Sequence, residues 1–204
     1  MLDIHINRAI VLLGAPGIDK TSIANTFCNN HTYKYTPSIY NILQTAFTWR
    51  ELVGFNKHYN IVVIDLPGQT DYSTINPEFL DINYIYIVVF SKYNYRSLET
   101  ACNIIKNLKC YLDIKSVNFA LLCSINNTGN TEKLIDDSFI EKSLSELNCK
   151  HYRQIFISDS NKIKSSIKDI IVRIDNNIDS NSNINFPEKN LARRRSQTTS
   201  CITM

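Results

Sequence analysis

The stretch "IVLLGAPGIDKTSIANTF", from Ile10 to Phe27, joins a short apolar run to an amphipathic segment through a loop that contains two glycines. The apolar run predicts a buried strand, and the segment that follows predicts a helix. A loop in this setting is suited to phosphate, because successive backbone N–H groups converge on the anion and the helix N-terminus adds partial positive charge. The stretch therefore predicts a phosphate-binding loop.

The loop fits the pattern G-x-x-x-x-G-K-[ST] through Gly14, Lys20 and Thr21, but Asp19 takes the place of the second glycine. In this pattern the lysine reaches the outer phosphates and the hydroxyl ligates Mg²⁺. A carboxylate about 5 Å from a phosphate costs roughly 3 kcal/mol at an effective dielectric near 20. Its Cβ also intrudes where glycine lets the backbone approach closely, so Asp19 predicts severely weakened nucleotide binding. Pro16 removes one N–H and stiffens the loop.

Further along the chain, continuous apolar runs bounded by turn residues predict buried strands. They cover residues 9–13, 61–66, 84–90, 119–123 and 155–157. Amphipathic stripes predict helices around residues 104–112, 139–147 and 163–174. A further strand at 46–52 is expected to pair with 61–66 as an antiparallel hairpin at the sheet edge. The prediction is an α/β fold with a mostly parallel six-stranded sheet and helices on both faces.

Composition limits the function classes. The 204 residues suit one domain, placed at 1–176, followed by a polar, disordered tail at 177–204. The net charge is +3, and part of it comes from Arg193, Arg194 and Arg195, so no nucleic-acid face is expected. The six cysteines form no C-x-x-C pair, which argues against a zinc site. Without a long apolar run or a leader, we expect a cytosolic protein.

Two more motifs follow the loop in order. "YTPSI" spans Tyr35 to Ile39, and "DLPGQ" spans Asp65 to Gln69 directly after a predicted strand. An ordinary strand-to-helix turn with no phosphate-binding ancestry stays an alternative, which motifs in this order disfavour. With them the chain resembles the Ras superfamily of small GTPases, which implies a P-loop NTPase of the Ras-like G-domain type with GTP or GDP and Mg²⁺ as cofactors.

The resemblance assigns roles to the two motifs, which are similar to the first and second switches of the family. Ser38 stands for the threonine that meets Mg²⁺ and the γ-phosphate. Asp65 is implied near the metal, Gly68 as a donor to the γ-phosphate, and Gln69 as the residue that orients the attacking water. The switches imply contacts with effector proteins.

The base-recognition motifs match less well. The family has N-K-x-D after the fifth strand, where this chain has "SINN" from Ser124 to Asn127. An aspartate accepts two N–H groups of guanine, whereas the carboxamide of Asn127 offers one acceptor and one donor, so guanine preference stays open. The family's S-A-K loop corresponds to Ser158, Asp159 and Ser160, of which only the first matches.

The resemblance implies a site whose members share either phosphate, metal or base contact. The catalytic residue is Gln69, the metal ligands are Thr21, Ser38 and Asp65, and the nucleotide contacts are Gly14, Ala15, Pro16, Gly17, Ile18, Asp19, Lys20, Thr21, Ser38, Asp65, Gly68, Ser124, Asn127 and Ser158. Two functions stay open: a membrane-anchored GTP/GDP switch with binding weakened by Asp19, and a nucleotide-free pseudo-GTPase that acts as a tethered interaction module. Hydrolysis of GTP is expected only if the loop still binds nucleotide.

The tetrapeptide "CITM", from Cys201 to Met204, fits the C-a-a-X pattern, in which a final methionine favours farnesyl transfer to the cysteine. One prenyl chain anchors reversibly, and Arg193 to Arg195 supply a basic second signal. We therefore expect a prenyltransferase as partner and attachment to the cytosolic face of the plasma membrane or an endomembrane. The motifs do not distinguish the Ras, Rab and Rho branches.

Overall fold

The computed structural model describes residues 2–29, 41–50, 55–68, 77–112, 117–126 and 134–181. Within these ranges strands and helices alternate along most of the chain. Their order is β1 (Leu2–Leu13), α1 (Lys20–Phe27), β2 (Asn41–Arg50), β3 (Phe55–Asp65), the short 3₁₀ turn η2 (Pro77–Phe79), β4 (Ile85–Ser91), α2 (Tyr95–Tyr111), β5 (Phe119–Ile125), α3 (Asp137–Glu146), β6 (Tyr152–Phe156) and α4 (Ser160–Asn181).

The six strands form one sheet in the order β2-β3-β1-β4-β5-β6. The strand pair β2–β3 is antiparallel, and the other neighbouring pairs are parallel. This arrangement confirms the predicted mostly parallel six-stranded sheet with its antiparallel hairpin at one edge. The carboxyl ends of the parallel strands therefore lie at one edge of the sheet, where α/β proteins place their ligand sites.

Three strands begin earlier than predicted. The prediction missed their first halves because these are not continuous apolar runs. β1 starts at Leu2 rather than at residue 9, β2 at Asn41 rather than at 46, and β3 at Phe55 rather than at 61. In these extensions polar residues alternate with apolar ones, and polar pairs such as Asn7–Asn60 bond across the strands. Such alternation is typical of a sheet with one solvated face.

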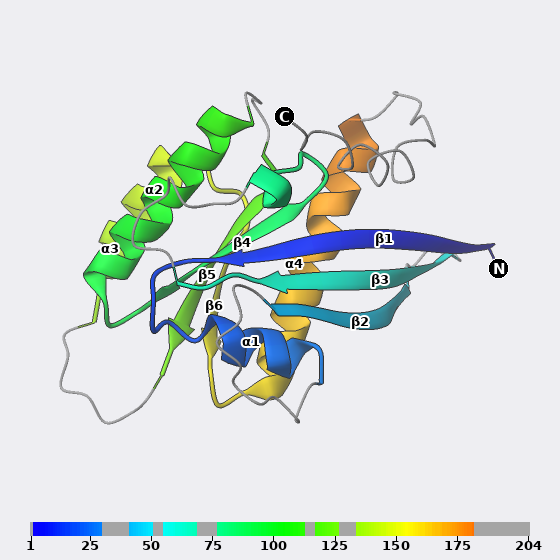
Figure 1. Ribbon diagram of the computed structural model, residues 1–204, viewed down its shortest axis with the longest axis horizontal. Helices are drawn as coiled ribbons and strands as arrows, with labels where there is room; N and C mark the ends of the chain where they lie inside the picture. Colours follow the sequence, from blue (N-terminus) through cyan, green and yellow to red (C-terminus); the bar gives the residue numbers. More distant parts are fainter. Residues whose placement is uncertain are drawn as a thin grey trace, which may run out of the picture.

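The sheet has an apolar core on each face, and successive strand residues contribute to opposite sides. Ile10 and Leu12 of β1 belong to the core under α1 and α4. Val11 and Leu13 belong to the core under α2 and α3. Figure 1 shows α2 and α3 lying together, apart from α1 and α4, and the long β1 and β3 extending past the helices.

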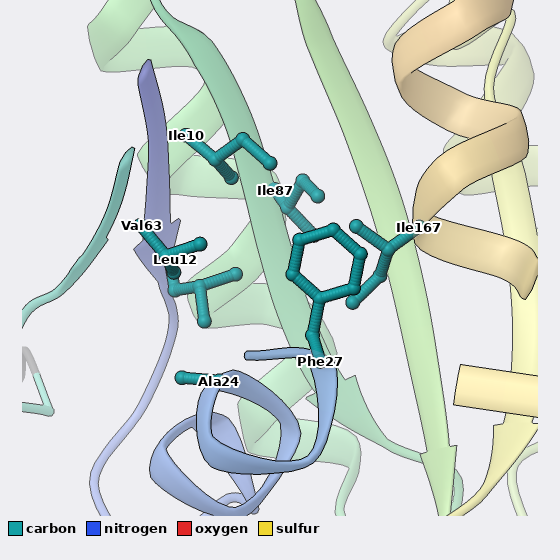
Figure 2. Close-up of a pocket in the computed structure, with 7 residues that line it drawn as sticks. All are labelled: Ile10, Leu12, Ala24, Phe27, Val63, Ile87 and Ile167. Carbon is teal, nitrogen blue, oxygen red and sulfur yellow. The ribbon is translucent and has the colours of Figure 1, made fainter. Parts of the chain in front are cut away.

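Helix α1 is held to the sheet by Phe27 in its last turn. The ring lies beside Ile87 and Ile167 in a small apolar space too narrow for a water molecule (Figure 2). The residues around it come from β1, α1, β3, β4 and α4: Ile10, Leu12, Ala24, Phe27, Val63, Ile87 and Ile167. Because α1 begins with Lys20, this packing fixes the position of the loop lysine relative to the sheet.

Helix α4 is attached to the first halves of β1 and β3 by polar contacts. Arg8 forms an ion pair at 2.6 Å with Asp175, which is 1% exposed. Lys57 donates a hydrogen bond to Asn176 at 2.9 Å. Helix α4 continues to Asn181, past the predicted end of the domain at residue 176. The division between domain and tail remains a prediction, since residues 182–204 lie outside the described ranges.

Candidate functional site

The loop between β1 and α1 leaves the sheet at a position that only glycine can occupy. Gly14 has a φ of +140°, and a Cβ added to it would lie 2.4 Å from the carbonyl oxygen of Val89 on β4. The side chain of Ile18 is buried in the core. Ile18 therefore anchors the loop, and only the backbone of this residue remains available to a ligand.

Lys20 turns back over this loop. Its Nζ donates to the carbonyl oxygen of Gly14 at 3.0 Å and to that of Ala15 at 2.8 Å, and the residue is 5% exposed. Burial lowers the pKa of Lys20 to about 8, while the nearby carboxylate of Asp65 opposes this shift. A buried ammonium held by two neutral carbonyls is suited to gaining an anionic partner.

Thr21 and Asp65 form the second part of the site. Asp65 ends β3 and pairs in register with Leu12 of β1, so it lies beside the start of the loop. Thr21 Oγ1 donates to Asp65 Oδ2 at 2.7 Å. The other oxygen, Oδ1, is buried and has no hydrogen-bond partner among the described residues, whereas buried carboxylate oxygens normally have one. A hydroxyl beside such a carboxylate fits the oxygen-ligand preference of Mg²⁺.

The chain returns to the loop after β3. A Cβ on Gly68 would lie 2.2 Å from Cα of Pro16 and 2.6 Å from its nitrogen. The backbone at Gly68 thus rests directly on the loop backbone, and the missing side chain is what permits the contact. Gly68 therefore lies against the loop between β1 and α1, while its predicted hydrogen bond to the γ-phosphate stays a prediction.

Asp19 fits a phosphate less well. It directly precedes α1, yet its side chain accepts no capping hydrogen bond from that helix. Its Oδ1 instead accepts a long hydrogen bond, at 3.5 Å, from the carboxamide of Asn126. The carboxylate therefore lies between the helix N-terminus and the segment after β5. An anion at that N-terminus would meet this carboxylate as well as the helix dipole.

Asn126 was not identified as a site residue from the sequence. The sequence could have indicated Asn126 only through its position next to Asn127 at the carboxyl end of a buried strand. Nothing in the sequence indicated its contact with Asp19. Its neighbour Ser124 is fully buried, and the Ser124 hydroxyl donates a weak bond to the carbonyl oxygen of Phe90 at 3.4 Å. That hydroxyl is used within the sheet.

The loop after β6 carries the remaining predicted contact. Ser158 is exposed at the carboxyl end of this strand. The carboxylate of Asp159 accepts a hydrogen bond from the backbone N–H of Lys162 at 2.8 Å, and its carbonyl oxygen accepts from Ile163. Asp159 therefore caps α4, which accounts for the acidic residue in this loop.

The predicted site residues that the structure describes all lie at the carboxyl edge of the sheet. Gly14 to Thr21, Asp65 and Gly68 are brought together there by β1 and β3. Ser124 is the residue before the last in β5, and Ser158 lies just after β6. Four predicted site residues lie outside the described ranges, namely Ser38, Gln69, Asn127 and Cys201, and so does the predicted membrane signal Arg193 to Arg195.

The described residues contain neither a metal-ion cluster nor a bilayer-spanning helix. No group of three or more His, Cys, Asp or Glu side chains among them could hold a metal ion. Within the same ranges, no helix combines the length and the apolar character needed to cross a bilayer.

Comparison with known proteins agrees with this geometry. A family model described as "Ras family" matches residues 9–180. The GTP-binding protein Rheb homolog of Dictyostelium discoideum is 22% identical over 177 residues, which cover 86% of this chain and 90% of the relative. The family match includes the loop, the Asp65–Gly68 segment and every strand from β2 to β6. The chain belongs to the Ras family of small GTPases.

Proposed function

We propose that this protein is a GTP- and GDP-binding molecular switch whose nucleotide affinity is reduced by Asp19. The observation that carries the proposal is the convergence of Lys20, Thr21 and Asp65 at the carboxyl edge of the sheet. Asp65 holds a buried oxygen there with no hydrogen-bond partner in the described part of the chain. An ordinary strand-to-helix turn would not need a buried lysine beside a carboxylate oxygen that lacks a hydrogen-bond partner.

Each residue contributes a separate function to this site. Lys20 would exchange two neutral carbonyl acceptors for phosphate oxygens, which bind an ammonium more strongly. Thr21 and Asp65 would hold Mg²⁺, and Ser38 is proposed as a further ligand. When bound, Mg²⁺ neutralises charge on the phosphate oxygens. Orientation of the attacking water by Gln69 is part of the same proposal.

The alternative function is a nucleotide-free interaction module that retains the G-domain fold. The observation that favours it is the carboxylate of Asp19, which directly precedes α1 and has Asn126 as its hydrogen-bond partner. A single carboxylate costs roughly 3 kcal/mol against a phosphate. That penalty abolishes useful binding only where the remaining contacts are weak, so the strength of those contacts decides between the two functions.

Replacing Asp19 by glycine tests the proposal directly. Asp19→Gly removes both the repulsion and the Cβ, so we expect the dissociation constant for GDP with Mg²⁺ to fall by about 100-fold. The measurement is titration of the nucleotide-stripped protein with a fluorescent GDP analogue. Asp3→Gly, which removes an exposed carboxylate at the far end of β1, is the control and should bind like the parent. If Asp19→Gly binds no better than the parent, repulsion by Asp19 is not what limits affinity.

The pKa of Lys20 predicts a dependence of binding on pH. Below that pKa of about 8 the lysine is already charged in the free protein. Above it, phosphate binding must first restore a proton, so affinity falls as the pH rises. One pH unit above the pKa, we expect the dissociation constant for GDP to be about tenfold higher. Lys20→Arg stays charged, so its affinity for GDP should show only the weak pH dependence due to the nucleotide itself. A steep fall in the affinity of that variant with rising pH would contradict the assignment.

Attachment to the cytosolic face of a membrane is proposed from the sequence. A prenyltransferase would attach farnesyl to Cys201, and Arg193 to Arg195 would add attraction to anionic lipid. Farnesyl transfer to the purified full chain should label the parent protein and the control Cys110→Ser, which loses an exposed cysteine of α2. It should not label Cys201→Ser, and equal labelling of that variant would refute the assignment. Effector contacts through the switch segments belong to the same proposal.

A further inference from the structure

Asp19 differs from the residues that precede helices α2, α3 and α4. Asn94, Asp136 and Asp159 each accept a hydrogen bond, through the side chain, from a backbone N–H at the start of the helix that follows. Such caps use N–H groups that have no partner within the helix. The side chain of Asp19 accepts no such bond from α1, although it directly precedes that helix and aspartate is a favoured cap.

The carboxylate of Asp19 has a different partner. Its Oδ1 accepts a long hydrogen bond, at 3.5 Å, from Nδ2 of Asn126, which lies 107 positions further along the chain. Asn126 directly follows β5, so this contact joins the loop after β1 to the carboxyl end of another strand of the sheet. The backbone of Asp19 agrees with this placement, because its φ of 4° and ψ of 12° lie outside the extended region that N-cap residues use.

This arrangement leaves the first turn of α1 available to an anion. A capping carboxylate would occupy the N–H groups that a phosphate uses, and its negative charge would lie next to the ligand. The carboxamide of Asn126 instead gives the carboxylate a donor that does not belong to α1. The carboxylate therefore keeps a hydrogen-bond partner when phosphate takes the helix N-terminus, and none of its bonds has to be broken first.

We infer that Asn126 is a positioning residue for phosphate binding: it holds the carboxylate of Asp19 away from the N-terminus of α1 and so limits the loss of affinity that Asp19 causes. This inference rests on the proposed nucleotide binding. A direct contact between Asn126 and the nucleotide base would be a different role, and its loss would also weaken binding. The two roles are distinguishable, because holding Asp19 matters only while Asp19 is present.

A double-mutant cycle in the full-length protein separates these roles. The measurement is titration of the nucleotide-stripped protein with a fluorescent GDP analogue in the presence of Mg²⁺. We expect Asn126→Ala to raise the dissociation constant about fivefold in the parent, which is the usual net contribution of one hydrogen bond. In the Asp19→Gly background the same replacement should have no effect. Asn126→Gln retains a carboxamide donor on a longer side chain, so it should weaken binding less than Asn126→Ala.

Asn118 offers a matched control at the other end of the same strand. It directly precedes β5, and its carboxamide donates a hydrogen bond of similar length, 3.3 Å, to the carbonyl oxygen of Ile82. Asn118→Ala should bind the GDP analogue like the parent. Equal weakening by Asn118→Ala and Asn126→Ala would mean that affinity follows the integrity of the sheet around β5, and it would overturn the inference.

The cycle also separates failure of this inference from failure of the proposed function. If Asn126→Ala weakens binding equally in the parent and in Asp19→Gly, or in neither, Asn126 does not act through Asp19, and only the inference is overturned. If neither the parent nor Asp19→Gly binds the GDP analogue, the proposed function fails and the inference fails with it. Thermal unfolding shows whether each variant is folded, and Asn126→Ser, which also removes the carboxamide, completes the cycle if Asn126→Ala is not.

Discussion

The parallel pairing of β1 with β3 is the constraint on which the functional edge depends. Its register sets Leu12 opposite Asp65, so the carboxylate comes to the start of the loop between β1 and α1 and accepts a hydrogen bond from Thr21 at 2.7 Å. The continuation of β3 then brings Gly68 onto Pro16. A shift of one residue would turn Asp65 to the other face of the sheet and disassemble the site. The long first halves of both strands, attached to α4 through Arg8 and Lys57, make that register difficult to change.

Asp19 stands in contrast to this otherwise consistent site. Lys20, Thr21 and Asp65 come together as the proposed nucleotide site requires, while Asp19, directly before α1, would oppose the ligand by charge and by volume. Asn126, directly after β5, donates a hydrogen bond to the carboxylate of Asp19. Sites that break a local rule are often where function has changed, and under the proposed function the change concerns nucleotide affinity rather than how the chain folds.

Much of this could be predicted from the sequence, and the exceptions have physical causes. Continuous apolar runs such as the one before Gly14 identified the buried strands, and the family motifs placed Lys20 and Asp65. The early residues of β1 and β3 were missed because one of their faces is solvated, so their pattern alternates. The contact between Asn126 and Asp19 was missed because these residues are far apart in the chain, and only the packed sheet brings them together.

The most direct test of the account is the nucleotide that the protein carries when it is purified. The full chain, purified without added nucleotide, is denatured, and the released molecules are identified and quantified per mole of protein by chromatography. A nucleotide-binding switch weakened by Asp19 should release GDP or GTP at a measurable level, below one per protein. A folded protein that releases no nucleotide and binds none when GDP and Mg²⁺ are added would contradict it and favour the nucleotide-free module.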